Sequence, residues 1–203
     1  ILLCFFGLIS LAQLKNNTKP FVVVLDAGHG GKDPGRPTSY GYKEKDIALD
    51  IVLRVGKQLE NKENLKVIYT RKNDKFLELR QRAAIANKAD ADLFISVHCN
   101  AHNTQAYGTE TYVLGLHRNE SNFRVAQQEN EVIFMEDDYE QNYDGFNPND
   151  PESVISLILM QETYLDQSIE AASSIQKSFV NNLNRKDRTV KQAGFVVLKY
   201  TYI

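Results

Sequence analysis

Two histidines and one glutamate are the side chains whose types and positions could carry out chemistry together. His29 lies in the glycine-rich run Asp26–Gly31, Glu44 follows a polar segment, and His98 comes directly after an apolar run. Two imidazoles and one carboxylate are the ligand set of an open catalytic zinc site, which keeps a fourth position for water. Zinc in that role lowers the pKa of its water to about 7 and polarises a carbonyl oxygen, and amide hydrolysis needs both effects.

Each of these residues also has a purely structural interpretation. Glu44 at the front of a helix is favoured by the helix dipole alone, and a single histidine at a strand end is more often hydrogen-bonded than metal-bound. The glycine-rich run has neither the lysine of a phosphate-binding loop nor the glycine spacing of a dinucleotide fold. His102 and His117 lie in polar stretches and are expected at the surface. Spacing alone therefore leaves the metal site as one interpretation among several.

The elements that must position these side chains follow from the apolar pattern. Short apolar or alternating runs predict strands at 21–25, 65–70, 93–97, 108–114 and 195–199. Longer stretches predict helices at 45–61, 78–88, 120–134 and 151–183. This alternation predicts an α/β fold, a three-layer sandwich with a mostly parallel central sheet flanked by helices. Functional groups in such sheets gather beyond the carboxyl ends of strands, where His29 and His98 both lie.

The composition is that of a single globular domain. The chain has 203 residues, of which 42% are hydrophobic and 25% charged, and we expect one domain over residues 21–203 after a short linker at 13–20. The formal net charge of −2 gives no electrostatic reason to expect nucleic acid or an anionic membrane surface as partner.

The first residues, Ile1–Ala12, form an almost unbroken apolar run that is too short to span a bilayer. Small residues followed by the polar Gln13 are typical of a signal-peptide cleavage site, here without its charged start, although a buried strand or helix is the alternative. We therefore expect an exported protein without an integral membrane span. Cys99 is then the only cysteine of the mature chain, so no internal disulfide is expected.

Several segments, in the order in which they occur, carry a resemblance to a known family. They are Leu25–Gly31, Glu44–Leu49, Tyr69–Arg71, Leu77–Arg80, Ser96–Ala101, Gly108–Tyr112 and Asp187–Ala193. Together they resemble the zinc-dependent N-acetylmuramoyl-L-alanine amidases of the AmiC-like family (amidase type 3), over nearly all of the chain from Phe21 to Lys199. The resemblance implies that the protein cleaves the amide bond between N-acetylmuramic acid and L-alanine in peptidoglycan, in the periplasm or cell envelope, for cell-wall remodelling or daughter-cell separation. It also implies that His29, Glu44 and His98 are the three ligands of Zn2+.

The resemblance places the general base outside this chain. The family's catalytic glutamate lies just beyond the segment 195–199, and here no acidic residue stands between Asp187 and Ile203. Glu110 matches a strand position of the family that is not the catalytic one, so it is not favoured as a substitute. Two alternatives stay open: a catalytically impaired peptidoglycan-binding or regulatory module, and another zinc amidase or peptidase on a related sheet.

Extra residues between about 131 and 168 distinguish this chain from shorter members of the family. Related periplasmic amidases carry an inserted helix there, which covers the zinc cleft until an activator protein displaces it. We expect this segment to be such a cover, with an acidic side chain near the metal. The alternatives are a passive surface helix and, for the acidic, aromatic-rich stretch 136–150, an exposed connector.

Overall fold

The computed structural model describes residues 19–36, 41–100, 107–115, 120–153 and 164–201. The expected signal peptide at 1–12, His102 and His117 lie outside these ranges. No helix within the described ranges is long and apolar enough to cross a membrane.

Three parallel strands form the sheet that carries the two histidines. β1 (Phe21–Ala27) lies between β2 (Leu65–Tyr69) and β3 (Leu93–Val97), and Leu25 of β1 is opposite Ile95 of β3. β1 is apolar from Phe21 to Leu25 and buried from Val22 onward, as expected for a strand covered on both faces. Parallel pairing brings the carboxyl ends of the three strands to the same edge, and the loops after β1 and β3 both leave from there.

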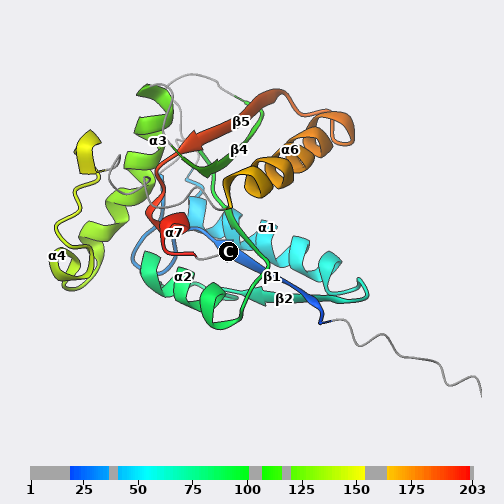
Figure 1. The fold of residues 1–203 in the computed structure, drawn as a ribbon, viewed down its shortest axis with the longest axis horizontal. Coiled ribbons are helices and arrows are strands. Elements are labelled where there is room, and N and C mark those ends of the chain that lie inside the picture. Colours follow the sequence, from blue (N-terminus) through cyan, green and yellow to red (C-terminus); the bar gives the residue numbers. More distant parts are fainter. Residues whose placement is uncertain (1–18, 37–40, 101–106, 116–119, 154–163, 202–203) are drawn as a thin grey trace, which may run out of the picture.

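Two helices cover opposite faces of this sheet. The odd-numbered core residues of β1 pack with Val52 of α1 (Glu44–Leu59), and the even-numbered ones pack with Ala86 of α2 (Leu79–Lys88). The result is the α/β arrangement predicted from the sequence, with helix, parallel sheet and helix in three layers (Figure 1).

Two further strands form a separate small sheet (Figure 1). β4 (Thr109–Leu114) pairs in parallel with β5 (Asp187–Ala193), and α6 (Leu165–Asn181) packs against them. Gln176 of α6 accepts a hydrogen bond from the Thr111 hydroxyl and donates one to the Thr109 carbonyl. The described strands therefore form two parallel sheets, where the sequence predicted one central sheet.

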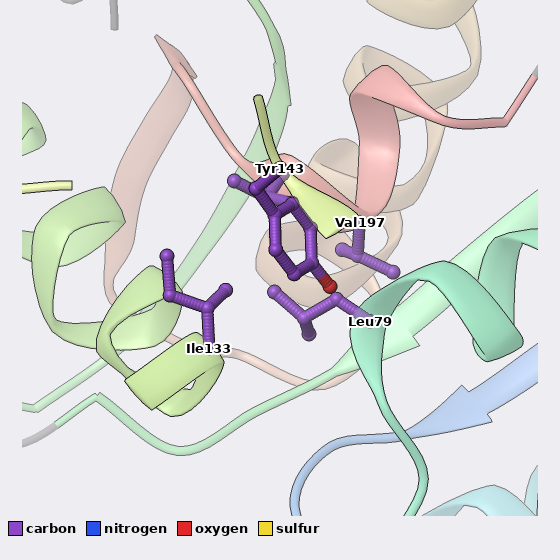
Figure 2. Packing of buried hydrophobic residues seen from close by; sticks show 5 residues of the cluster. Leu79, Ile133, Tyr143 and Val197 are labelled. Atoms are coloured by element: carbon purple, nitrogen blue, oxygen red, sulfur yellow. The ribbon is translucent and has the colours of Figure 1, made fainter. Parts of the chain in front are cut away.

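The segment 195–199, predicted as the last strand, is a short helix, and that prediction was wrong. The helix is α7 (Val196–Lys199), and the strand, β5, comes just before it. Val196 and Val197 are buried in an apolar cluster that also contains Leu79 and Ile133 (Figure 2). A short apolar run is compatible with a buried strand or a buried helical turn, so tertiary packing decides between them. β5 was not predicted as a strand because most of its side chains are polar.

The middle of the chain forms three short helical elements, α3 (Glu120–Asn130), the 3-10 helix η1 (Glu131–Met135) and α4 (Tyr139–Asn142). The helix predicted at 120–134 therefore changes its winding after Asn130. Of the helix predicted at 151–183, residues 151–153 are helical and α6 begins at Leu165, and the part at 154–163 lies outside the described residues.

The stretch 136–150 is more than an exposed connector, because two of its polar side chains are buried. Glu136 is 5% exposed and Tyr143 is 3% exposed. Tyr143 donates its hydroxyl hydrogen to one oxygen of Glu136 at 2.6 Å, and the Leu79 N–H donates to the other at 2.8 Å. Leu79 opens α2, so this carboxylate fastens the stretch to the first turn of that helix.

Candidate metal centre

Four side chains converge at the carboxyl edge of the β1–β3 sheet. His29 stands in the loop after β1, Glu44 is the first residue of α1, His98 follows β3, and Glu129 lies in the last turn of α3. One nitrogen or oxygen atom from each of the four lies within 4.8 Å of the corresponding atoms of the others. The structure therefore brings together the three residues singled out from the sequence and adds a fourth, Glu129.

The spacing of these atoms fits a tetrahedral metal ion. His29 Nε2 lies 3.1 Å from Glu44 Oε1 and 3.3 Å from Glu129 Oε2. His98 Nδ1 lies 3.3 Å and 2.9 Å from the same two oxygens, and the two nitrogens are 3.1 Å apart. Ligand atoms about 2.0–2.2 Å from a tetrahedral zinc ion are separated from one another by about 3.3–3.6 Å. A slight expansion of the cluster would therefore admit zinc.

The carboxylate of Glu129 gives a second reason to expect a cation. Its Oε2 atom is buried and has no hydrogen bond of proper geometry within the described residues, although His98 Nδ1 is close. A buried, charged oxygen without a well-aligned hydrogen bond is costly. A metal ion between the four side chains would remove that cost.

The electrostatics of the cluster favour the charged form of every member. Burial lowers the pKa of both imidazoles, but the neighbouring carboxylates outweigh it and raise the pKa of His29 to about 11 and that of His98 to about 9. Burial raises the pKa of Glu44 and Glu129, but the two imidazoles outweigh it and the net shift is downward. Two ionised carboxylates beside two imidazoles form a strong donor set for a divalent cation, which displaces the imidazole protons when it binds.

The loop that carries His29 is held by two buried guanidinium groups. His29 itself has a φ of 60°, a conformation that is uncommon for a side-chain-bearing residue. Arg82 donates a hydrogen bond to the His29 carbonyl at 2.8 Å, and Arg71 donates one to the Gly28 carbonyl at 2.8 Å. Arg71 also donates to the Lys45 carbonyl at 2.7 Å, so one side chain joins this loop to the start of α1, next to Glu44.

The charge of Arg82 is balanced by Asp26, a buried residue of β1. Arg82 Nη1 donates to Asp26 Oδ1 at 2.9 Å, and the hydroxyls of Thr70 and Ser96 each donate to the carboxylate at 2.6 Å. Burial raises the pKa of Asp26, but Arg82 and the two hydroxyls outweigh it and the net shift is downward. An ionised Asp26 therefore neutralises Arg82, which in turn holds the loop that carries His29.

Glu44 is fixed from two directions. The Cys99 N–H donates to its Oε1 at 2.6 Å, and the Arg36 N–H donates to its Oε2 at 3.0 Å. The side chain is 1% exposed, and it ties the loop after β1 to the loop after β3. Glu44 thus has the orientation of a ligand rather than that of a solvent-exposed helix start.

Glu129 is placed by its neighbour in the chain. Asn130 donates from Nδ2 to the Gly194 carbonyl at 2.8 Å, and its Oδ1 accepts the Val196 N–H at 2.9 Å. The amide group of Asn130 therefore pairs with the backbone between β5 and α7 as another peptide group would. This double hydrogen bond holds the last turn of α3 over the metal centre.

Sequence reasoning missed Glu129, because two of the three residues that mark the inward stripe of α3 are polar. Asn122, Ala126 and Asn130 are buried and mark the inward stripe of the helix. Glu129 lies three residues after Ala126, beside that stripe, so its carboxylate also faces inward. Glu110, the unfavoured substitute base, does not belong to the cluster of four. Its carboxylate accepts hydrogen bonds from Asn100 and Lys191 instead.

Comparison with known proteins shows which families and structures this chain resembles. A family model described as N-acetylmuramoyl-L-alanine amidase matches residues 23–203. The N-acetylmuramoyl-L-alanine amidase AmiC of Escherichia coli O6:H1 is 33% identical over 192 residues, which cover 89% of this chain and 43% of AmiC. An endolysin of Bacillus phage SPP1 is 52% identical over 91 residues, 45% of this chain and 33% of the endolysin. The chain thus spans less than half the length of these two relatives.

A solved structure has the same fold. The crystal structure of an N-acetylmuramoyl-L-alanine amidase from Clostridium difficile 630 aligns with a TM-score of 0.66 and 23% sequence identity. The alignment covers 92% of this chain and 76% of that one.

Proposed function

Since this chain belongs to the N-acetylmuramoyl-L-alanine amidase family, we propose that it hydrolyses the amide bond between N-acetylmuramic acid and L-alanine in peptidoglycan, using Zn2+ bound by His29, Glu44 and His98. The observation that carries the proposal is the convergence of these three side chains, from three separate elements, at distances that suit a tetrahedral ion. Peptidoglycan lies outside the cytoplasmic membrane, so the proposal includes export to the cell envelope.

The roles of the residues follow from their placement. When bound, zinc would supply the Lewis acidity that polarises the scissile carbonyl and makes water a better nucleophile. His29 presents Nε2 and His98 presents Nδ1, while Glu44 presents Oε1 and keeps its other oxygen on the Arg36 N–H.

Glu129 gives the second part of the proposal, which concerns regulation. Catalytic zinc sites have three protein ligands and one open position, whereas four protein ligands are typical of closed sites. With Glu129 in the fourth position, the centre has the ligand number of a closed site. We propose that the segment from α3 through the insertion at about 131–168 is a cover, and that an activator protein opens the site by drawing Glu129 away.

The amidase proposal is tested by zinc content and by turnover of purified peptidoglycan, with the full-length protein. We expect one zinc per chain and the release of stem peptides with a free L-alanine amino group. His98→Ala should lose both, whereas His117→Ala, a change in a polar stretch, should keep both. Cleavage within the stem peptide would indicate a peptidase instead, and zinc without any turnover would indicate a binding module.

The cover is tested by comparing Glu129→Ala with Glu131→Ala, a change at a neighbouring exposed glutamate. Glu129→Ala should raise the basal turnover of peptidoglycan, because it leaves the fourth position open, and Glu131→Ala should not. Deletion of residues 136–161 should also raise it. Equal or lower turnover for both Glu129→Ala and the deletion, in folded proteins, would contradict a regulatory cover.

A further inference from the structure

Asp33 contacts the nitrogen of the His29 ring that faces away from the metal centre. His29 Nδ1 and Asp33 Oδ2 are 2.8 Å apart, and both side chains are 8% exposed. The other ring nitrogen, Nε2, is the atom that approaches Glu44 and Glu129. The two nitrogens of one imidazole thus serve two different partners.

The carboxylate of Asp33 is fixed by the backbone around it. Its Oδ1 accepts the Gly35 N–H at 3.0 Å, which leaves Oδ2 directed at His29. Asp33 and Gly30 also exchange two backbone hydrogen bonds, of 2.9 and 3.1 Å, so the loop closes on itself. The orientation of the carboxylate is therefore set by the loop and does not depend on a bound metal.

The turn that holds Asp33 lies directly against two of the proposed ligands. Gly35 has a φ of 71°, and a Cβ atom there would lie 2.6 Å from Glu44 Cβ and 2.8 Å from His29 Cδ2. Only a residue without a side chain fits at that point. Asp33 is therefore part of a tightly packed unit that spans His29 and Glu44.

We propose that Asp33 is a positioning residue that prepares His29 for zinc. A neutral imidazole has one N–H donor and one acceptor nitrogen. Because Asp33 accepts the Nδ1–H, the tautomer with a free lone pair on Nε2 is selected, and the ring is held with that lone pair toward the metal centre. A carboxylate in this place also increases the basicity of the ligating nitrogen. The inference rests on the proposed zinc site and concerns how the site acquires its affinity.

The first test measures the zinc dissociation constant of the full-length protein by competition with a chelator. Asp33→Asn keeps the size of the side chain but removes its charge, and Asp33→Ala removes the acceptor altogether. We expect zinc to bind about 10- to 100-fold more weakly to the alanine variant, the range seen when such outer partners of ligating histidines are changed, with a smaller loss for asparagine. Asp50→Asn, an exposed carboxylate of α1, is the matched control and should bind zinc as the wild type does.

The second test follows the His29 ring itself by nitrogen NMR of the zinc-loaded protein. In the wild type the Nδ1 proton should be observed and should exchange slowly with water, because Asp33 accepts it in a buried place. In Asp33→Ala this proton should exchange rapidly. A carboxylate that only stabilised the loop would leave the Nδ1 proton unchanged.

The outcomes separate this inference from the proposed function. If the wild type binds no zinc, both fail. If it binds zinc and both Asp33 variants bind within threefold of it, with the Nδ1 proton unchanged, only the role of Asp33 fails. Weaker zinc binding that is matched by loss of far-ultraviolet circular dichroism in both variants would also overturn it, because the effect would then be one of folding.

Discussion

Replacing Asp26 by asparagine should destabilise the protein strongly, although the side chain keeps its size. Asp26 is 1% exposed and accepts hydrogen bonds from Arg82, Thr70 and Ser96. Asp26→Asn leaves the guanidinium group of Arg82 buried without its counter-charge. An amide group also cannot accept all three of these hydrogen bonds, because its nitrogen is a donor.

The size of the effect can be worked out from the contacts that remain. Breaking a buried ion pair from one side costs about 3–5 kcal/mol, since the other charge stays uncompensated. Arg82 keeps its hydrogen bonds to the carbonyls of Ala27, Leu77 and His29. These partial negative charges favour the lower end of the range, about 3 kcal/mol. That is roughly a 100-fold change in the unfolding equilibrium, because about 1.4 kcal/mol corresponds to a factor of ten.

The assay is urea unfolding followed by circular dichroism, in which a lower midpoint at an unchanged slope reports a loss of stability. Asp50→Asn is the control, because Asp50 pairs with Arg54 in solvent and its loss should leave the midpoint almost unchanged. The double variant Asp26→Asn with Arg82→Met should cost less than the sum of the two single changes, by about 1–3 kcal/mol. A loss below about 1 kcal/mol for Asp26→Asn, or additive single changes, would refute the reasoning.

Three further predictions concern packing and pH. In Gly28→Ala the new methyl group would overlap the ring of His98, so zinc content measured by metal analysis should fall, while urea unfolding should still show a folded protein. In Gly56→Ala the methyl group would overlap the Tyr69 ring, and this overpacking, of about 1–3 kcal/mol, should exceed the gain of at most about 1 kcal/mol in helix propensity and lower the melting temperature. Burial raises the pKa of Glu136 above its ordinary value of 4.5, so its contribution is fully present below that pH and is lost as the pH rises through the raised pKa. The urea midpoint should therefore fall less steeply in Glu136→Gln than in the wild type as the pH rises above about 4.5, and equal slopes in the two proteins would contradict this.

The sheet edge that carries the metal centre could be predicted because its candidate ligands lie at the ends of regular strands and helices. His98 comes directly after an apolar run and His29 comes shortly after one, and parallel strands bring their carboxyl ends together. Glu44 opens a helix with a clear apolar stripe. For these three residues, the local sequence pattern predicts the same position at the sheet edge that the fold gives them.

Glu129 and the C-terminal strand could not be predicted in the same way, because tertiary contacts decide both. Glu129 reaches the metal centre only because Asn130 bonds to a segment more than sixty residues later. In β5 the polar Lys191 and Gln192 hide the strand, while the apolar Val196 and Val197 that follow form a helical turn. Sequence periodicity describes neighbours along the chain and carries no information about such partners.

The hydrogen bonds of Asn130 offer a way to detect whether the proposed cover is open or closed. Because Asn130 accepts the Val196 N–H and stands next to Glu129, departure of Glu129 from the centre and exposure of that amide should be thermodynamically linked. Any ligand that favours the open form should then speed hydrogen–deuterium exchange at Val196, and zinc held by all four side chains should slow it. One backbone amide far from Glu129 in sequence would thus act as a reporter of whether the centre is open or closed, without substrate and without turnover.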